Sequence, residues 1–294
     1  MINIEDYLQR KQDLINQALD EYLSFTGPAA VLSAMRYSIE AGGKRLRPIL
    51  TIAVAESLGN ENDAIIDVAC ALEMIHTYSL IHDDLPAMDN SSLRRGKPTG
   101  HLVYGEAVAI LAGDALLTLA FEIAAKYGLQ KGRAEKAIQI VAEMSTAAGA
   151  AGMIGGQVLD LEAESAETSV EVIEKIAEMK TGALLRAAVL CGAIAADASV
   201  VQLKALTAYA DNIGPAFQIV DDLLDYESMI EELGKPVGAD QVHFKATYPA
   251  LLGNAEARQR AESFYQNALA ALEDLNCTTE LLSELARKIV YRKY

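Results

Sequence analysis

The sequence predicts an all-α protein that forms one large helical bundle. Alanine and leucine recur at helical spacing through most of the 294 residues, and the alternation typical of strands is missing. Hydrophobic residues make up 51% of the chain, which is enough for a sizeable core. Residues 107–128 and 200–227 show the pattern most clearly, with alanines on more than one side, as in central helices packed closely against neighbours.

Glycine and proline mark where successive helices end. In chain order the breaks are Thr26-Gly27-Pro28, Gly42-Gly43, Leu85-Pro86, residues 96–100, Tyr127-Gly128, Gly155-Gly156, Gly234-Lys235-Pro236 and Tyr248-Pro249. None is long enough to be a flexible linker, so we expect residues 1–294 to form a single domain of about ten or more helices. No short-period repeat is visible, which argues against a solenoid.

The charge balance excludes one class of partner. The chain has 25 Lys and Arg residues against 41 Asp and Glu residues, and a net charge of −16 excludes a surface that holds nucleic acid by bulk positive charge. The start of the chain is polar and acidic, and no run of about 18 apolar residues is uninterrupted. A membrane bundle is the alternative, but charges such as Asp114, Glu122 and Lys126 break the apolar stretches. We therefore expect a cytoplasmic protein without stable membrane insertion.

Two clusters of three aspartates stand at the ends of apolar stretches: Asp83, Asp84 and Asp89 after residues 68–81, and Asp221, Asp222 and Asp225 after residues 217–220. On a helix, Asp221 and Asp225 stack on one face, about 6 Å apart along the axis, where they can share a hard cation. Asp89 would leave the face of Asp83 on a regular helix. Pro86 ends or kinks the helix, which lets Asp89 return toward Asp83.

Carboxylates in this pattern predict magnesium. Mg²⁺ keeps several waters and binds through one or two carboxylates together with substrate phosphates. For either cluster alone, the alternative is a solvated acidic helix end. Aspartate is a poor helix former and is costly beside apolar helix, so two such clusters together favour a metal site.

Three cationic segments stand out against the acidic chain: Gly42-Gly43-Lys44-Arg45-Leu46-Arg47-Pro48, Arg94-Arg95-Gly96-Lys97-Pro98 and Gly234-Lys235-Pro236. The spacing of Lys44 and Arg47 brings both to one side of a helical turn or its lead-in. Arginine grips phosphate oxygens bidentately and lysine supplies a point charge, although Lys97 or Lys235 alone could equally be a solvated loop lysine. Aspartates would repel an anionic diphosphate unless divalent cations lay between them. The two sets of charges together predict a cavity that holds diphosphate through Mg²⁺ and guanidinium groups.

Seven segments in order resemble the trans-isoprenyl diphosphate synthases, and bacterial farnesyl diphosphate synthases in particular: GGKRLRP, MIHTYSLIHDDLPAMDNSSLRRGKPTGH, GEAVAILAGDALL, GGQVLDLEAE, MKTGALLRAA, GPAFQIVDDLLDYE and LGKPVGADQVHFKATYPALLG. They cover nearly the whole chain. The resemblance implies a homodimer of all-helical subunits, each with about ten core helices around a deep central cavity. It also implies three Mg²⁺ per active site when substrate is bound.

The implied reaction condenses isopentenyl diphosphate with dimethylallyl or geranyl diphosphate to give farnesyl diphosphate. The allylic diphosphate ionises, the alkene of isopentenyl diphosphate attacks the carbocation, and a proton leaves. Preplaced cations stabilise the charge that develops on the leaving group. Thr181 and Gln218 could supply oxygen dipoles for the carbocation in a dry cavity.

The resemblance assigns a role to each matching residue. Direct Mg²⁺ ligands are Asp83, Asp89 and Asp221, supported by Asp84, Asp222 and Asp225. The allylic diphosphate is held by Arg94, Lys180 and Lys235, with Gln218 and Thr181 lining its path. Isopentenyl diphosphate is held by Lys44, Arg47, His76 and Arg95. His76 alone would more simply be a structural histidine, which is also the expectation for His82.

Tyr78 is the candidate for setting product length. It lies five residues before Asp83, about 7.5 Å along a helix axis, so its side chain would meet a growing isoprenoid tail at the length of a C15 product. The alternative is an ordinary core aromatic. The spacing of the first motif also occurs in geranylgeranyl diphosphate synthases, which leaves a C20 product open.

Two other classes of function stay open. The chain could be a non-catalytic partner subunit of a prenyl synthase, although loss of one aspartate cluster would be expected then, and it could be a plain helical scaffold. The basic C-terminal residues 291–294 are a further candidate element, which could close over the isopentenyl site.

Overall fold

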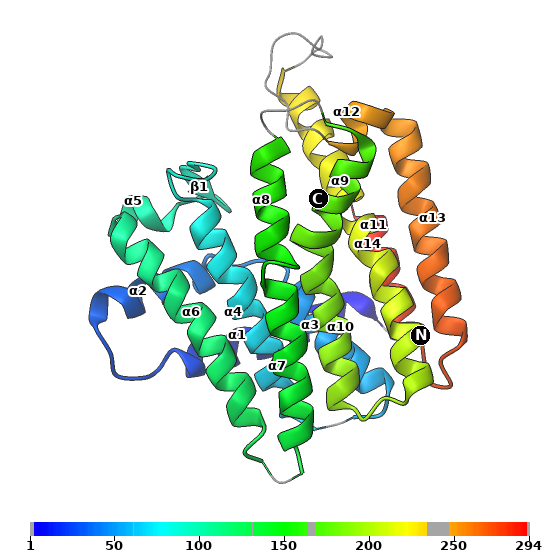
Figure 1. The fold of residues 1–294 in the computed structure, drawn as a ribbon, viewed down its shortest axis with the longest axis horizontal. Coiled ribbons are helices and arrows are strands. Elements are labelled where there is room, and N and C mark those ends of the chain that lie inside the picture. The colour runs from blue at the N-terminus through cyan, green and yellow to red at the C-terminus, as the bar shows by residue number, and fades with distance from the viewer. Residues whose placement is uncertain (1–2, 61, 131, 164–167, 234–246, 293–294) are drawn as a thin grey trace. The chain divides into compact units, whose positions relative to one another are not determined.

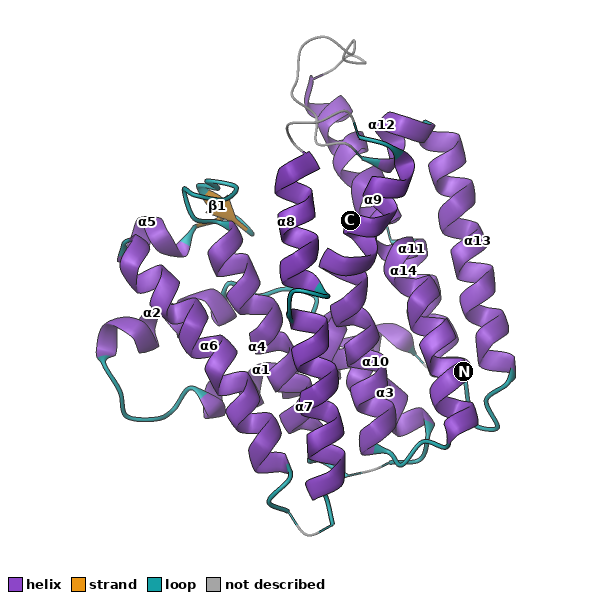
Figure 2. Cartoon of the chain, viewed as in Figure 1, coloured by secondary structure: helices purple, strands orange, loops and turns teal. Residues whose placement is uncertain are grey.

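The structure is a computed structural model that describes residues 3–60, 62–130, 132–163, 168–233 and 247–292, without the side chains of residues 228–233. In this part of the chain nearly all regular structure is helical (Figures 1 and 2). The all-α prediction is therefore confirmed.

The contacts of the chain divide it into two compact units. Unit 1 comprises Met1–Ala142 and Ile194–Ala196, and unit 2 comprises Glu143–Ala193 and Asp197–Tyr294. Helices α7 (Ala134–Ala148) and α10 (Ala183–Ala195) each contribute residues to both units. The single domain expected for residues 1–294 stays a prediction.

Unit 1 is built around its fourth helix. Its elements are α1 (Ile4–Tyr22), α2 (Ala29–Glu40), α3 (Leu46–Ser57), α4 (Ile65–Asp83), β1 (Leu93–Arg94), β2 (Lys97–Pro98), α5 (Gly100–Tyr104) and α6 (Glu106–Tyr127). Helix α4 packs against α3 and α6, and residues 68–75 are buried without interruption. An apolar helix of this kind is buried on every side because each face meets a neighbour. The end of α4, which carries the first aspartates, is thereby held in a rigid frame.

A short hairpin follows the first acidic motif, where the sequence suggested only a break. Strands β1 and β2 pair antiparallel with Leu93 opposite Pro98 and Arg94 opposite Lys97. The two turn residues, Arg95 and Gly96, have φ angles of 53° and 76°. A two-residue turn with positive φ at both positions matches the right-handed twist of the strands. The hairpin, seen in orange in Figure 2, places all three cations of the Arg94-Arg95-Gly96-Lys97 segment on one small structure.

Unit 2 is built around the long helix α11. Its elements are α8 (Met153–Ala163), α9 (Val170–Ile176), the π-helical segment η1 (Ala177–Gly182), α11 (Val200–Leu233), α12 (Tyr248–Leu252), α13 (Asn254–Glu273) and α14 (Glu280–Val290), together with the unit's parts of α7 and α10. Helix α11 packs along α13 and also contacts η1, α12 and α14. Pro215 lies inside α11, where it cannot donate a backbone hydrogen bond.

Two glycines allow the backbone of η1 to lie very close to its neighbours. A Cβ atom added at Gly156 of α8 would lie 2.2 Å from the backbone nitrogen of Lys180, and one at Gly214 of α11 would lie 2.9 Å from the Cα of Gly182. Any larger residue at either position would push η1 away. Short π-helical segments often occur at functional sites, and this one carries Lys180 and Thr181.

Within the described residues, three helical stretches are long and apolar enough to cross a membrane by length and composition alone: Ile65–Asp83, Glu106–Tyr127 and Ala134–Ala163. In the first, 67% of the apolar window is buried inside the protein, so its hydrophobicity is explained by the core of unit 1. The other two windows are 39% buried.

Candidate active site

The first acidic motif is a tight turn at the end of α4. The helix stops at Asp83, and the backbone N–H of Asp89 donates to the carbonyl oxygen of Asp83 at 2.9 Å. Inside this loop, the N–H groups of Met88 and Asn90 both donate to the carbonyl oxygen of Leu85. The prediction that the chain around Pro86 returns Asp89 to Asp83 is therefore confirmed for the backbone.

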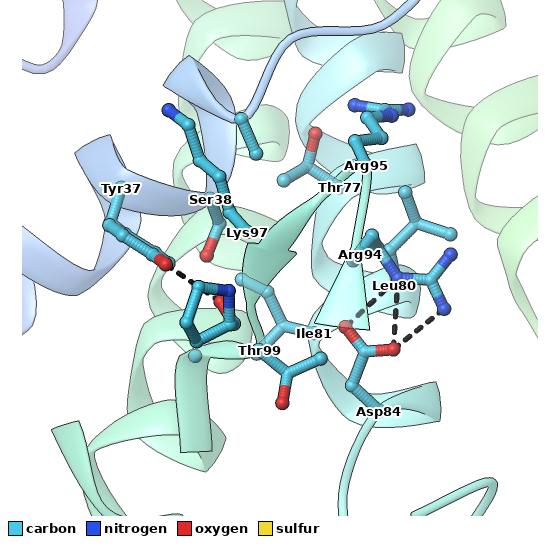
Figure 3. Close-up of a pocket in the computed structure, with 13 residues that line it drawn as sticks. Tyr37, Ser38, Thr77, Leu80, Ile81, Asp84, Arg94, Arg95, Lys97 and Thr99 are labelled. Carbon is cyan, nitrogen blue, oxygen red and sulfur yellow. Dashed lines mark hydrogen bonds and ion pairs between the residues drawn. The ribbon is translucent and has the colours of Figure 1, made fainter. Parts of the chain in front are cut away.

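The middle aspartate of this motif is bound by an arginine from the hairpin. Nε of Arg94 donates to both carboxylate oxygens of Asp84 at 2.9 Å, and Nη2 donates to Oδ1 at 2.6 Å (Figure 3). Asp84 is buried and Arg94 is partly exposed. Burial of a carboxylate is costly unless it is paired, and Arg94 supplies that pairing for Asp84 within unit 1.

Asp84 and the three cations of the hairpin line one small pocket (Figure 3). The hairpin is tied to α2 there, because the hydroxyl group of Tyr37 donates to the carbonyl oxygen of Pro98 at 2.7 Å. The pocket thus collects positive charge beside the first acidic motif, with Arg95 and Lys97 on the same hairpin as Arg94.

His76 lies in a strongly cationic environment. Burial lowers the pKa of His76 well below its usual value of 6.5, and the guanidinium groups of Arg47, Arg95, Arg94 and Arg45 lower it further. Four of the residues predicted to bind substrate, His76 and three arginines, are therefore close enough to act on one another. The imidazole is neutral at pH 7, which leaves it able both to donate and to accept a hydrogen bond.

The segment before α3 is anchored by a buried ion pair that was not predicted from the sequence. Nη1 of Arg45 lies 2.7 Å from Oε1 of Glu73 on α4, and both side chains are at most 3% exposed. Arg45 also donates to Asn16 and to the carbonyl oxygen of Ile39. Its neighbour Lys44 is exposed and lies just before the helix, whereas Arg47 is buried in the first turn of α3.

The second acidic motif remains helical and lies within α11. Nη2 of Arg292, near the C-terminus, donates to Oδ1 of Asp221 at 2.5 Å and to the carbonyl oxygen of Phe217 at 3.1 Å. Its guanidinium group also lies over the ring of Phe217, 4.1 Å from the centroid. Burial raises the pKa of Asp225, and the charge of Arg292 opposes that shift.

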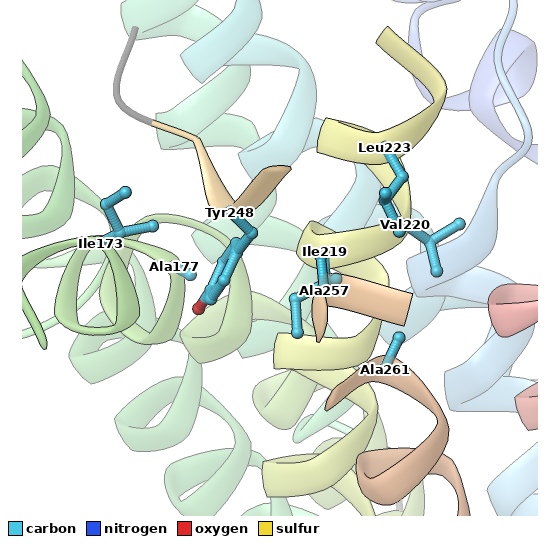
Figure 4. Close-up of a cluster of buried hydrophobic side chains, with 8 residues drawn as sticks. All are labelled: Ile173, Ala177, Ile219, Val220, Leu223, Tyr248, Ala257 and Ala261. Carbon is cyan, nitrogen blue, oxygen red and sulfur yellow. The ribbon is translucent and has the colours of Figure 1, made fainter. Parts of the chain in front are cut away.

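Asp222 occupies a more enclosed position than its neighbours in the motif. Nε2 of Gln218 donates to Oδ1 of Asp222 at 2.8 Å, and the backbone N–H of Tyr248 donates to Oδ2 at 3.1 Å. Burial raises the pKa of Asp222 to about 6, although both hydrogen bonds lower it. Tyr248 belongs to a buried cluster with Ile219 and other apolar residues of unit 2 (Figure 4), which fixes the donor beside Asp222.

The π-helical segment η1 brings two predicted residues into this unit. Nζ of Lys180 lies 2.7 Å from Oδ2 of Asp160 on α8, and the hydroxyl group of Thr181 lies 2.8 Å from Oε1 of Gln218 on α11. Asp160 was not singled out in the sequence, although its place in the segment GGQVLDLEAE was a signal. A cavity of about 420 Å³ adjoins η1 and is lined by Met179, Gly182 and Pro215, among others, and by none of the predicted site residues.

The donors present around the predicted magnesium ligands are carboxylates, which suit Mg²⁺. Among the described residues, no three His, Cys, Asp or Glu side chains are grouped so that they could hold a metal ion by themselves. Each acidic motif instead offers a few carboxylates, and Mg²⁺ binds well to such incomplete sets because waters and phosphate oxygens fill the remaining positions. The residues fit Mg²⁺ bound together with an anionic substrate.

Tyr78 is buried, as a wall residue would be. It is 5% exposed, and its ring meets the ring of His82 edge to face, with centroids 5.7 Å apart. Among the described residues, its buried hydroxyl group has no hydrogen-bond partner. Nε2 of His82 lies 3.0 Å from the carbonyl oxygen of Ile110 on α6, and the structural role expected for His82 stays a prediction.

One predicted residue, Lys235, lies outside the described residues, as do the last two residues of the C-terminal segment. Lys44, Arg47, His76, Tyr78, Asp83, Asp84, Asp89, Arg94 and Arg95 all belong to unit 1. Lys180, Thr181, Gln218, Asp221, Asp222 and Asp225 belong to unit 2.

The known proteins to which this chain is similar all point to one family. A family model described as polyprenyl synthetase matches residues 28–283. The farnesyl diphosphate synthase of Geobacillus stearothermophilus is 42% identical over 100% of this chain and 99% of its own length. The geranylgeranyl diphosphate synthase of Cyanophora paradoxa is 45% identical over 90% of this chain and 89% of its own.

A solved structure to which this chain is similar points to the same family. The crystal structure of an FPP/GFPP synthase from Zymomonas mobilis superposes with a TM-score of 0.85 at 35% identity, covering 99% of both chains. The family match spans most of the sequence, and the relatives match along nearly their full lengths. The chain therefore belongs to the polyprenyl synthetase family.

Proposed function

We propose that this protein is a Mg²⁺-dependent prenyltransferase that condenses isopentenyl diphosphate with dimethylallyl and geranyl diphosphates to form farnesyl diphosphate. One observation carries the proposal. In unit 1 the acidic turn at Asp83 is joined through Asp84 and Arg94 to a hairpin of cations. Carboxylates that suit Mg²⁺ and guanidinium groups that suit phosphate then lie side by side, as binding of a metal diphosphate requires.

Each set of residues has a distinct task in this reaction. Asp83, Asp89 and Asp221 would be the direct protein ligands of Mg²⁺, with three ions bound when substrate is present. These ions would neutralise the charge of the leaving diphosphate. Asp84, Asp222 and Asp225 support these ligands. Arg94, Lys180 and Lys235 hold the allylic diphosphate and stabilise the negative charge that develops as its C–O bond breaks.

The second substrate needs a site of its own. Lys44, Arg47, His76 and Arg95 hold isopentenyl diphosphate, and the neutral imidazole of His76 can donate a hydrogen bond without adding to the repulsion among the arginines. Thr181 and Gln218 contribute oxygen dipoles near the carbocation, which must be kept away from water. The proton that leaves passes to the departed diphosphate.

A C15 product is proposed because Tyr78 is large, buried and one and a half turns before Asp83. A C20 product is the second candidate, since a relative named geranylgeranyl diphosphate synthase is 45% identical. Tyr78→Ala should lengthen the product to C20 or beyond, and chromatography of the dephosphorylated products would detect it. An unchanged C15 profile would contradict a wall at Tyr78.

A homodimer is the proposed assembly. Helices α5 and α6 present an apolar strip to solvent, in which Leu102, Val103, Ile110 and Leu111 are 42% to 58% exposed. An exposed strip of this kind is typical of a surface that another chain covers. Burial of the α6 strip in a dimer also accounts for the hydrophobicity of that helix in a protein that we propose to be cytoplasmic, with no stable membrane insertion.

We propose that residues 1–294 act as one catalytic domain.

Product analysis of the purified chain tests the proposal directly. With dimethylallyl and isopentenyl diphosphates, we expect farnesyl diphosphate and inorganic pyrophosphate in the presence of Mg²⁺ and neither after chelation. A chain that makes product only when mixed with an active synthase would instead be a partner subunit. A helical scaffold would show no product and no rise in melting temperature with Mg²⁺ and a bisphosphonate together.

A further inference from the structure

A chain of hydrogen bonds in unit 2 joins three of the predicted site residues. The hydroxyl group of Thr181 lies 2.8 Å from Oε1 of Gln218, and Nε2 of Gln218 donates to Oδ1 of Asp222 at 2.8 Å. The other carboxylate oxygen of Asp222 accepts the backbone N–H of Tyr248 at 3.1 Å. Both oxygens of Asp222 are thus bound to donors of the protein.

The charge of Asp222 fixes the direction of every bond in this chain. An ionised carboxylate only accepts hydrogen bonds, so Gln218 must turn its NH₂ group toward Asp222. The carbonyl oxygen of Gln218 then faces Thr181, and it too can only accept. The one hydroxyl hydrogen of Thr181 is therefore committed to Gln218, and its oxygen offers only lone pairs to any other group.

The surroundings make this direction effective. Thr181, Gln218 and Asp222 are each half-buried, and the two residues beside Asp222, Tyr248 and Leu223, are 1% and 3% exposed. Hydrogen bonds in such a medium polarise one another, which transmits negative charge from Asp222 toward the oxygen of Thr181. An electron-rich oxygen without a free hydrogen attracts a cationic carbon and repels a phosphate oxygen.

We propose that Asp222 is a positioning residue, which acts through Gln218 to hold Thr181 as an acceptor-only oxygen for the allylic cation. The inference rests on the proposed prenyl transfer, which generates this cation when the diphosphate leaves. It replaces the metal-supporting task proposed above for Asp222: Asp221 serves the metal, and Asp222 sets the polarity of Thr181.

The substitution Asp222→Asn reverses the chain. The carbonyl oxygen of the new amide accepts from Tyr248, so its NH₂ group faces Gln218, and Gln218 must turn over to accept it. The NH₂ group of Gln218 then points at Thr181. Adding Gln218→Glu restores the original direction, because the new carboxylate accepts from the amide at position 222 and from Thr181. The double variant keeps the net charge of the wild type.

Steady-state kinetics on the full-length protein separates the possibilities. We expect Asp222→Asn to lower kcat about tenfold to a hundredfold, as loss of an oriented dipole does, and the double variant to regain most of that loss. The Mg²⁺ concentration for half-maximal rate should stay within about twofold in both, whereas Asp221→Asn, the matched control, should raise it. The melting temperature, a readout independent of activity, should not fall with Asp222→Asn, because every hydrogen bond of the chain is kept with its direction reversed.

Several outcomes would overturn the proposal. One is a Mg²⁺ requirement in Asp222→Asn that rises as it does in Asp221→Asn, and another is a folded double variant as slow as the single one. If the variants at position 222 do not fold, Thr181→Val and Thr181→Ser decide, because only Val should lose the rate and equal rates would refute the role of the hydroxyl. A wild-type chain that makes no product would refute the proposed function instead.

Discussion

The two acidic motifs each carry three aspartates and an arginine partner, but they differ in backbone structure and in where the arginine comes from. In the first, α4 ends at Asp83 and a turn carries Asp89 back, and the arginine that binds the motif comes from ten residues further on. In the second, α11 continues through all three aspartates, and the arginine comes from 71 residues further on. The first motif is a local structure, whereas the second depends on the packing of α14 against α11.

The arginines also bind different members of the two motifs. Arg94 binds Asp84, which is proposed to support the metal ligands, whereas Arg292 binds Asp221, which is proposed to be one. Arg94 therefore leaves metal ligation in its motif to Asp83 and Asp89, whereas Arg292 would compete with Mg²⁺ for the proposed ligand Asp221. In the second motif, metal binding to Asp221 would therefore weaken a contact of the protein.

The largest expected effect comes from removing the charge of a metal ligand. Asp83→Asn and Asp221→Asn should each lower kcat about 10²- to 10³-fold, because both motifs are proposed to stabilise the leaving diphosphate through Mg²⁺. Asp274→Asn, which changes an exposed aspartate after α13, is the control. Stopped assays of product formation measure the effect. If only Asp83→Asn were impaired, the two motifs would not be equivalent in catalysis.

A second prediction concerns the cations around the first motif. The pKa of His76 is lowered in the folded protein, so below the unfolded value of about 6.5 only the unfolded chain takes up this proton. Stability should therefore fall as the pH drops from 6.5 to 5.5, by up to about 1.4 kcal/mol from His76. Urea unfolding should show a smaller loss in His76→Gln. Inorganic pyrophosphate should raise the pKa of His76 in NMR titrations, and no change would separate His76 from the anion site.

Removal of Arg292 tests the competition at the second motif. Arg292→Ala should lower the Mg²⁺ concentration for half-maximal rate about fivefold, which corresponds to an ion pair of about 1 kcal/mol. Calorimetric titration of Mg²⁺ with inorganic pyrophosphate present provides a readout apart from activity. Arg287→Ala removes an arginine of α14 that pairs with Glu284 and serves as control. A weaker Mg²⁺ affinity in Arg292→Ala would show that the arginine assists the site.

The smallest expected effect is at Tyr78. Its buried hydroxyl group has no hydrogen-bond partner in the part of the chain that the structure describes, so Tyr78→Phe should leave the free energy of unfolding unchanged or raise it by up to about 1 kcal/mol. Product length should stay the same because the ring remains. Destabilisation by more than about 1 kcal/mol would show that the hydroxyl group of Tyr78 has a hydrogen-bond partner after all.

The comparison also explains what the sequence could predict. The return of Asp89 was predictable because Pro86 and the aspartates lie within seven residues, where local geometry decides the path. The hairpin after Asp89 was not recognised, because its turn residues Arg95 and Gly96 lack the usual Asn-Gly or Asp-Gly signal.

Contacts that join distant residues could not be predicted. The partners Arg45 and Glu73 are 28 residues apart, and Tyr248 and Asp222 are 26 apart. Such pairs depend on how helices pack, and nothing in the spacing of the residues specifies that packing. Helical periodicity therefore gave the fold class, whereas the order of hydrogen bonds around each aspartate required the structure.

The glycine contacts on both sides of η1 have a consequence for how this protein can change over generations. Gly156 and Gly214 leave no room for even a methyl group beside the backbone that carries Lys180 and Thr181. Substitutions elsewhere in α8 and α11 can change the side chains that face the interior of unit 2, while these two glycines keep η1 in position. We therefore expect Gly156 and Gly214 to stay unchanged as such enzymes diverge, and new substrate lengths to arise from changes in the residues that line the interior.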